Sequence, residues 1–417
     1  MFSNQYRVLS DAKFRRFTLS CMLAMFGNGL TYIIMVWALM RFDTSVVSTS
    51  ILMACFWLPN VLLGPFFGVL ADRWNRKTLL LMANGSRAMV LFGFAYLAND
   101  HMTSLSIYIL AALIGTLLAV YIPVAMSFVR ELVNEEELLA GNAMVDIAYE
   151  LGAVAGMGGA GFILASSSFA GCFAINAVCY VMATLLLLGI PFVKKSNEEK
   201  KRTSFFRQFI DGGRYILARR TLLLLYLTQG LFFVSYMTAP VLLAPYAKTV
   251  LNSNVTQFGW LEAMLSLGII LGGFFNPWLA SMFSMFKVIV AEILAGVVGF
   301  YLFSHTSNIH LAIFYHFLIG LSFSSWALLT TLAQEMTALD FQGRVQSLFN
   351  SVSGVVIVLF YYLLAKWKDI PVQKLYSGEI VLLLTALILL GIAILKKTSN
   401  DNELDLNEEE FSCNSPG

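Results

Sequence analysis

Apolar runs about as long as a bilayer is thick recur along almost the whole chain and constrain its fold more than any other feature. A helix needs about 20 apolar residues to cross the hydrocarbon core, so the chain accommodates about twelve crossings. Hydrophobic residues make up 58% of the 417 residues and charged residues only 12%, which excludes a soluble globular protein. We predict spans at residues 17–40, 47–70, 78–98, 104–127, 141–165, 171–192, 221–244, 257–280, 287–304, 310–331, 346–365 and 378–395.

A charged stretch at residues 68–77 separates the second and third apolar runs and has the pattern G-x-x-x-D-R-x-x-R-K. Burying these charges in lipid costs several kcal/mol, so the stretch must lie at a membrane surface. The pattern resembles the loop between helices 2 and 3 of the major facilitator superfamily, with Asn75 where that family usually has Gly. Asn tolerates left-handed backbone angles better than most residues, so we expect the turn to survive there.

The basic residues are unevenly distributed between the connections of the predicted spans. With the N-terminus in the cytoplasm, 21 of the 27 Lys and Arg residues fall on the cytoplasmic side, and Arg87 lies within a span. Cytoplasmic loops carry such an excess of positive charge, so we predict a multi-pass inner-membrane protein with both termini cytoplasmic. The five basic residues on the other side are Arg41, Lys248, Lys366, Lys368 and Lys374.

One long polar interval, residues 194–220, divides the chain into two halves of six spans. Its second part alternates apolar and basic residues at helical spacing, which predicts a helix along the inner leaflet. The Glu131 region before span five matches the Glu335 region before span eleven, which indicates a weak internal repeat. We therefore predict an all-α membrane protein of twelve transmembrane helices in two pseudo-symmetric six-helix bundles. The predicted division is a cytoplasmic N-terminus (1–16), a first bundle (17–193), the linker with its interfacial helix (194–220), a second bundle (221–396) and an acidic cytoplasmic tail without fixed structure (397–417).

Further motifs resemble the branch of the major facilitator superfamily that holds macrolide-type drug exporters and enterobactin-type siderophore exporters. These motifs are Asn84-Gly-Ser-Arg87-Ala, Glu131-Leu-Val before span five, Asp211-Gly-Gly-Arg-Tyr215 before span seven and Gly343-Arg344-Val before span eleven. The resemblance implies a secondary transporter with a cytoplasmic gate, in which the acid of the 68–77 loop caps a helix end of the other half. The alternative is a plain positively charged loop. The implied gate residues are Gly68, Asp72, Arg73, Arg76, Lys77 and Arg344.

Carboxylates within the spans are the candidates for coupling transport to protons, because the chain has no G-x-x-x-x-G-K-[ST] phosphate loop for ATP. Asp146 and Glu150 lie four residues apart on one face of span five, about 8 and 14 Å into the helix. Two poorly hydrated acids this close resist ionising together, which suits them to taking up and releasing a proton. Glu262 in span eight is the third candidate. Arg87 is the expected charge partner; alternatively, it neutralises the acids and only holds helices together.

Aromatic and polar residues on several spans predict a cavity for a bulky, partly polar organic solute. Each of them alone is equally explained by packing. Glu292, which lies among aliphatic residues, is expected to have a local hydrogen-bonded role instead. The glycine-rich run 152–161 permits close helix packing and also resembles the helix-five motif of exporters. The predicted cavity residues are Asn28, Tyr32, Trp37, Trp57, Asn60, Tyr149, Gln229, Ser235, Tyr236 and Trp326.

The predicted function is export of a small amphiphilic molecule, a drug or a siderophore, by proton antiport and alternating access. A siderophore substrate would place the protein in iron homeostasis. The alternatives are an importer of a siderophore or related solute, a lysophospholipid transporter, and a receptor or scaffold with this fold. The motifs H-E-x-x-H and G-x-S-x-G are absent, so we expect no enzyme. The expected partners are the solute, protons and the lipid bilayer; we expect a monomer without metal, cofactor or nucleic acid.

Overall fold

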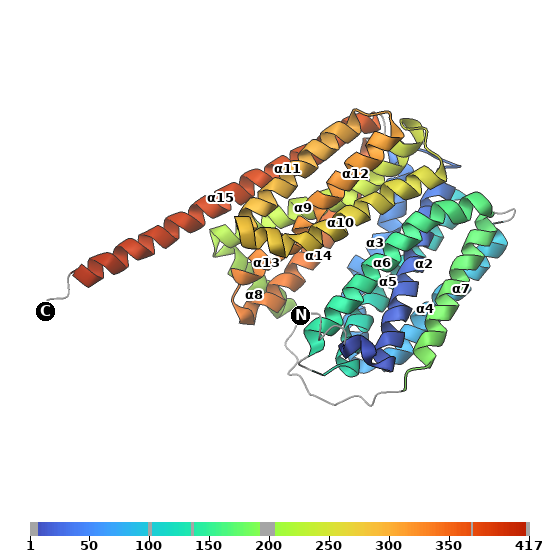
Figure 1. Ribbon diagram of the computed structural model, residues 1–417, viewed down its shortest axis with the longest axis horizontal. Helices are drawn as coiled ribbons and strands as arrows, with labels where there is room; N and C mark the ends of the chain where they lie inside the picture. The colour runs from blue at the N-terminus through green and yellow to red at the C-terminus, as the bar shows by residue number, and fades with distance from the viewer. Residues whose placement is uncertain (1–6, 99–101, 135–136, 192–204, 368–369, 414–417) are drawn as a thin grey trace.

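The computed structural model describes residues 7–98, 102–134, 137–191, 205–367 and 370–413 as helices joined by short connections (Figure 1). Within these ranges, 12 helical segments are long and apolar enough to cross a membrane, and they correspond to the predicted spans. The elements are α2 (Ala12–Leu39), α3 (Val46–Arg73), α4 (Arg76–Leu97), α5 (Ser104–Leu132), α6 (Leu138–Ser166), α7 (Phe169–Leu188), α8 (Phe205–Leu217), α9 (Arg220–Thr249), α10 (Val255–Phe283), α11 (Met285–Ser304), α12 (Ile309–Phe323), α13 (Ser325–Glu335), α14 (Leu339–Lys366) and α15 (Val372–Cys413).

Helices α2 to α7 pack into one bundle and α9 to α15 into another, and Figure 1 shows the two bundles in blue to green and yellow to red. In the first bundle α3 packs on α5 and α4 on α7; in the second, α10 packs on α12 and α11 on α15. These pairs occupy equivalent places in the two halves, which gives the pseudo-symmetric arrangement predicted from the repeat. The predicted helix in the linker is α8, which packs against α14.

The helices alternate in direction, so the molecule has two faces. We call the face on which α2 and α4 begin, and on which α8 lies, the basic face. Among the described side chains it carries Arg76, Lys77, Arg214 and Arg344, which come from both halves of the chain. We call the other face, on which α3, α5 and α10 begin, the opposite face.

Asn75 determines where α4 begins, but not in the way that the sequence predicted. Its side chain accepts a hydrogen bond from the backbone N–H of Thr78 at 3.1 Å, and its φ is −67°. The expectation of a left-handed turn at Asn75 was therefore wrong. An extended backbone lets the short amide cap the first turn of the helix, which is the position that Asn favours.

The acidic tail also differs from its prediction. Helix α15 continues without interruption to Cys413 and leaves the body of the molecule as the long red helix in Figure 1. Glu, which occurs four times in this tail, is a good helix former, so a helix that begins in the last span can continue into it.

The predicted span 310–331 is interrupted at Ser324, where α12 ends and α13 begins. The Ser324 hydroxyl donates a hydrogen bond to Glu292 Oε1 at 2.8 Å, and Asn276 Nδ2 donates one to Glu292 Oε2 at 3.3 Å. Three helices are thus joined at the interruption. The local hydrogen-bonded role expected for Glu292 is confirmed.

Candidate functional site

The described contacts between the two bundles gather in the half of the molecule toward the opposite face. Thr49 in α3 donates a hydrogen bond to the carbonyl of Val241 in α9 at 2.9 Å. Thr256 at the start of α10 donates one to the carbonyl of Gly161 near the end of α6 at 3.3 Å. Toward the basic face, the ion pairs between described residues lie within one half of the chain. The structure is therefore closed at the opposite face.

Aromatic side chains reinforce this closed end. The ring centroids of Trp37 in α2 and Phe258 in α10 lie 5.7 Å apart, and the Lys248 ammonium lies 4.7 Å from the Trp37 ring. Phe162 and Trp260 form a second ring contact between the bundles, at 6.0 Å. In this conformation Trp37, which was predicted to line the cavity, belongs to the contact that closes one end of it.

A direct hydrogen bond joins the bundles at Tyr32 and Glu262. The Tyr32 hydroxyl in α2 donates to Glu262 Oε1 in α10 at 2.8 Å, and Glu262 is only 3% exposed. The sequence prediction assigned Tyr32 to the cavity and Glu262 to proton coupling, so the structure brings together two residues predicted for different tasks. A hydrogen bond to a carboxylate is stronger than one to a neutral acid, so this contact depends on the charge of Glu262.

Asp146 and Glu150 lie on α6 with both side chains exposed, one turn apart as predicted. Across the interface, Tyr236 in α9 lies close enough to both Glu150 and Glu262 to interact with their charges. These interactions link ionisable groups of the first bundle, Asp146, Glu150 and Tyr32, to Tyr236 and Glu262 of the second. We call these five residues the inter-bundle line.

Part of the predicted cavity set forms an aromatic group in the second bundle. Tyr236 contacts Phe323 with ring centroids 5.1 Å apart, and Trp326 contacts Phe233 at 5.7 Å. In the first bundle Asn28, Trp57, Asn60 and Tyr149 are partly exposed.

Gln229 and Ser235 do not line the interface in this conformation. Gln229 is 1% exposed and donates a hydrogen bond to Thr330 Oγ1 at 2.9 Å, and Ser235 is fully buried. Helical spacing predicted that both lie within a span, but it did not predict which side of α9 faces its own bundle.

Arg87 does not pair with the acids in this conformation. Its guanidinium is fully buried and lies over the rings of Tyr121 and Tyr180, 4.7 and 5.4 Å from their centroids. Tyr149 lies within electrostatic range of both Arg87 and Asp146. The predicted ion pair is replaced by a cation stacked on aromatic rings, because α4 turns Arg87 toward α5 and α7.

The gate residues with described side chains contact their own half of the chain. Arg76 forms an ion pair with Glu131 at 2.7 Å, and Lys77 donates to the carbonyl of Leu188 at 3.3 Å. Arg344 forms an ion pair with Asp211 of α8 at 3.4 Å. The surroundings of Gly68 and the side chains of Asp72 and Arg73 lie outside the described part of the structure.

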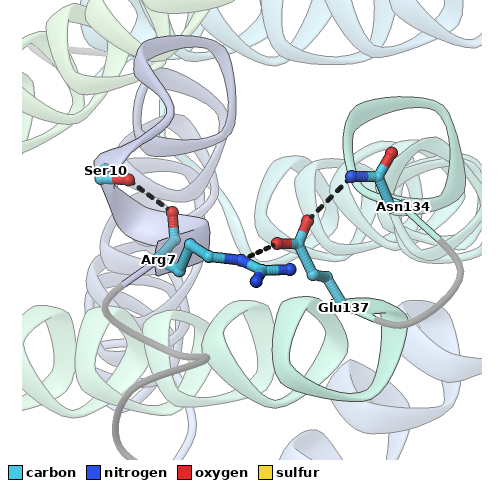
Figure 2. Close-up of polar contacts among 4 residues, drawn as sticks. All are labelled: Arg7, Ser10, Asn134 and Glu137. Carbon is cyan, nitrogen blue, oxygen red and sulfur yellow. Dashed lines mark hydrogen bonds and ion pairs between the residues drawn. The ribbon is translucent and has the colours of Figure 1, made fainter.

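A further contact at the basic face fixes the described residues before α2 to the first bundle (Figure 2). Arg7 forms an ion pair with Glu137, which directly precedes α6, and Asn134 donates to the same carboxylate at 3.4 Å. Ser10 donates to the carbonyl of Arg7 at 2.6 Å. This arrangement joins the residues before α2 to the connection between α5 and α6.

Glu379 is a further buried acid and is not among the residues predicted from the sequence. Glu379 is 3% exposed and accepts a hydrogen bond from Thr238 Oγ1 at 2.6 Å, which joins α15 to α9. The polar residues before it placed Glu379 at the edge of the predicted span. The signal was present, because an acid next to a long apolar run is costly unless it is paired.

The sequence matches a known protein family. It matches the Major Facilitator Superfamily over residues 17–361. An uncharacterized MFS-type transporter of Bacillus subtilis (strain 168), YfiS, is 22% identical over 365 residues, which are 85% of this chain and 87% of YfiS. The enterobactin exporter EntS of Escherichia coli O1:K1 is 25% identical over 214 residues, which are 51% of this chain and only 50% of EntS.

Solved transporter structures share the fold. The nucleoside transporter NupG superimposes with a TM-score of 0.70 at 13% identity, covering 92% of this chain and 98% of NupG. The POT family transporter PepTSo gives a TM-score of 0.66 at 14% identity, covering 93% of this chain and 98% of PepTSo. At such low identity these similarities bear on the fold alone.

Proposed function

Because the chain belongs to the major facilitator superfamily, we propose that it is a proton-coupled exporter of a small amphiphilic organic molecule. The observation that carries the proposal is the inter-bundle line, in which Tyr236 lies within electrostatic range of a carboxylate from each bundle and Glu262 accepts a hydrogen bond from Tyr32 across the interface. Ionisable groups within a membrane are costly and mark ion or solute pathways. We place both termini in the cytoplasm, so that the structure is open toward the cytoplasm and closed outside.

Exchange of a solute for a proton follows if the two compete for the same side chains. Asp146 and Glu150 are exposed on α6, whereas Glu262 is buried in the contact with Tyr32. Deprotonated carboxylates bind the polar part of a solute, and protonated ones bind it less strongly. A solute that takes the place of the Tyr32–Glu262 bond removes one contact that holds the outer end closed.

The substrate class follows from the side chains beside the line. Tyr236, Trp326 and Phe233 present partly exposed apolar faces, and Tyr236 and Trp326 add polar tips, which suits an aromatic or amphiphilic solute. Similarity to an enterobactin exporter over about half of that protein favours a siderophore over other amphiphiles. A drug-like amphiphile is the alternative substrate.

The first test is a comparison of small molecules in culture medium and cell extract, between wild type and a deletion strain grown with scarce iron. We expect a chelator that is retained in the mutant cells and missing from the medium. A chelator that accumulates outside while the mutant starves for iron would reverse the proposed direction. If no chelator differs, the siderophore proposal fails, and the sensitivity of the two strains to toxic amphiphiles tests the drug alternative.

Replacing Tyr32 with phenylalanine is expected to favour the conformation that is open at the opposite face. The substitution removes the donor to Glu262 and preserves the ring, so it costs the closed state about 1.5–3 kcal/mol, or a roughly ten- to hundredfold shift in population. Nitroxide labels at Phe42 and Leu311, both exposed at the opposite face, would measure the separation of the bundles in a cysteine-free protein.

Glu262→Gln is the matched control for this measurement, because its amide oxygen still accepts a hydrogen bond from Tyr32 but carries no charge. Its distance distribution should lie between those of wild type and Tyr32→Phe. Identical distributions for all three proteins would show that this hydrogen bond does not hold the bundles together.

A further inference from the structure

A basic pocket lies at the connection between the two bundles and takes no part in the proposed transport path. Its volume is about 430 Å³, and it lies between α8 and the first turns of α14. The residues that line it are Asp211, Arg214, Tyr215, Phe341 and Arg344.

The pocket has a fixed support, because α8 is held closely on α14. The Tyr215 hydroxyl accepts a hydrogen bond from the backbone N–H of Ala338 at 2.9 Å, and Ala338 precedes the first turn of α14. A Cβ atom at Gly212 would lie only 2.9 Å from the carbonyl oxygen of Arg344, so the approach of the two backbones requires glycine there. The side chains of both helices are therefore positioned relative to one another.

Two aromatic rings and two guanidinium groups form a stack beside the pocket. The rings of Tyr215 and Phe341 are nearly parallel, with centroids 4.3 Å apart and an interplanar angle of 17°. The guanidinium carbon of Arg219 lies 3.9 Å from the Tyr215 centroid, and that of Arg344 lies 5.1 Å from the Phe341 centroid. Since the rings cover each other on one side, the arginines cover their outer sides. Stacking orders a guanidinium while its N–H donors remain directed outward from its edges.

Among the described side chains, positive charge exceeds negative charge around this stack. Arg214, Arg219 and Arg344 are accompanied by one lining carboxylate, that of Asp211. The Arg344–Asp211 ion pair has an N–O distance of 3.4 Å, and its two side chains are 36% and 34% exposed. A long, partly hydrated pair leaves donors for a second anion. Paired arginines with planar donors match the oxygen atoms of a phosphate group.

The exposed face of α8 adds apolar side chains on both sides of the charge. Ile210 is 51% exposed and Leu217 is 68% exposed, and both lie on the same helix face as the exposed Arg214. This pattern is typical of helices that lie in a membrane interface. We propose that the pocket binds the phosphate group of a membrane phospholipid, held by Arg214 and Arg344, with Ile210 and Leu217 against its acyl chains. This proposal is independent of the substrate and direction of transport.

Native mass spectrometry of the full chain, titrated with phosphatidylglycerol or phosphatidylcholine, tests the proposal. We expect tighter binding of phosphatidylglycerol, because the pocket carries excess positive charge. Arg214→Gln and Arg344→Gln should each weaken this binding about tenfold or more, the usual loss for one hydrogen bond to a charged group. Arg220→Gln is the matched control, since Arg220 is exposed on α9 and does not line the pocket.

Competition with sn-glycerol 3-phosphate distinguishes the possible sources of the phosphate. No displacement of the lipid supports a phospholipid head group as the ligand, and displacement at similar concentrations supports a phosphate site filled from solution. Binding of phosphatidylglycerol to Arg214→Gln and Arg344→Gln as tightly as to wild type would overturn the proposal. Equal weakening by Arg220→Gln would also overturn it, because only net charge would then matter.

Discussion

Glu150→Gln and Asp146→Asn are each expected to abolish proton-driven transport while the protein remains folded. The amide side chains preserve size and hydrogen bonding but cannot take up or release a proton. Both positions are exposed on α6, so neither substitution leaves a buried group without a partner. Purified variants in vesicles with an imposed pH gradient should accumulate the compound identified by the metabolite comparison no faster than empty vesicles do.

Two comparisons separate loss of coupling from loss of the protein. Exchange of labelled for unlabelled compound without a gradient should continue in both variants, because exchange requires binding and rocking but no net proton movement. It should need a higher compound concentration than in wild type, because an amide binds the solute less strongly than a carboxylate does. Glu292→Gln makes the same chemical change at an acid that binds Ser324 and Asn276 within the second bundle, so it should retain gradient-driven transport. Gradient-driven transport at the wild-type rate in both Glu150→Gln and Asp146→Asn would remove these residues from the proposed mechanism.

The sequence predicted the spans well because the thickness of the bilayer determines the length of an apolar run. It predicted their ends less well. Helix α14 begins at Leu339, seven residues before the predicted start at 346, because a helix can continue through polar residues such as Gln342 and Arg344 once it has left the lipid. The interruption at Ser324 was not predictable from hydropathy, since it depends on contacts with Glu292 and Asn276 from other helices.

The candidate site was predicted in its residue types but not in its pairings. Distance along a helix gives the depth of Arg87 but not the direction of its side chain, so the stacking on Tyr121 and Tyr180 was not predicted. Tyr32 and Glu262 were both predicted to be site residues, but the contact between them depends on how α2 and α10 cross. Such pairings are properties of packing between helices that lie far apart in the sequence.

The glycine-rich run of α6 has two packing faces, and these explain why its sequence allowed two interpretations. A Cβ atom at Gly156 would overlap the carbonyl oxygen of Phe26 in α2, within the first bundle. A Cβ atom at Gly161 would lie 2.5 Å from Thr256 Cα in α10, across the interface between bundles. The first face serves the packing of one bundle, and the second serves the contact that closes the opposite face.

Gly156→Ala is therefore expected to destabilise the protein strongly, and Gly156→Val to prevent its accumulation. The added Cβ meets main-chain atoms of Phe26 and Leu30, so α2 and α6 can accommodate it only by moving apart. Overpacking a core usually costs about 1–3 kcal/mol. We expect a cost near the upper end of this range, because main-chain atoms cannot relieve the overlap by changing rotamer as a side chain can. Thermal unfolding in detergent, followed by size-exclusion chromatography, would measure the effect.

Gly93→Ala is the matched control, because a Cβ atom at Gly93 meets nothing within 4 Å. There the higher helix propensity of Ala should stabilise the protein by up to about 1 kcal/mol. The two Gly→Ala substitutions should therefore change the free energy of unfolding in opposite directions. Phe26→Ala should not rescue Gly156→Ala, because the overlap involves the Phe26 main chain and not its ring. Rescue by Phe26→Ala, or equal melting temperatures for Gly156→Ala and Gly93→Ala, would contradict a backbone contact at Gly156. Side-chain packing would then determine the distance between α2 and α6.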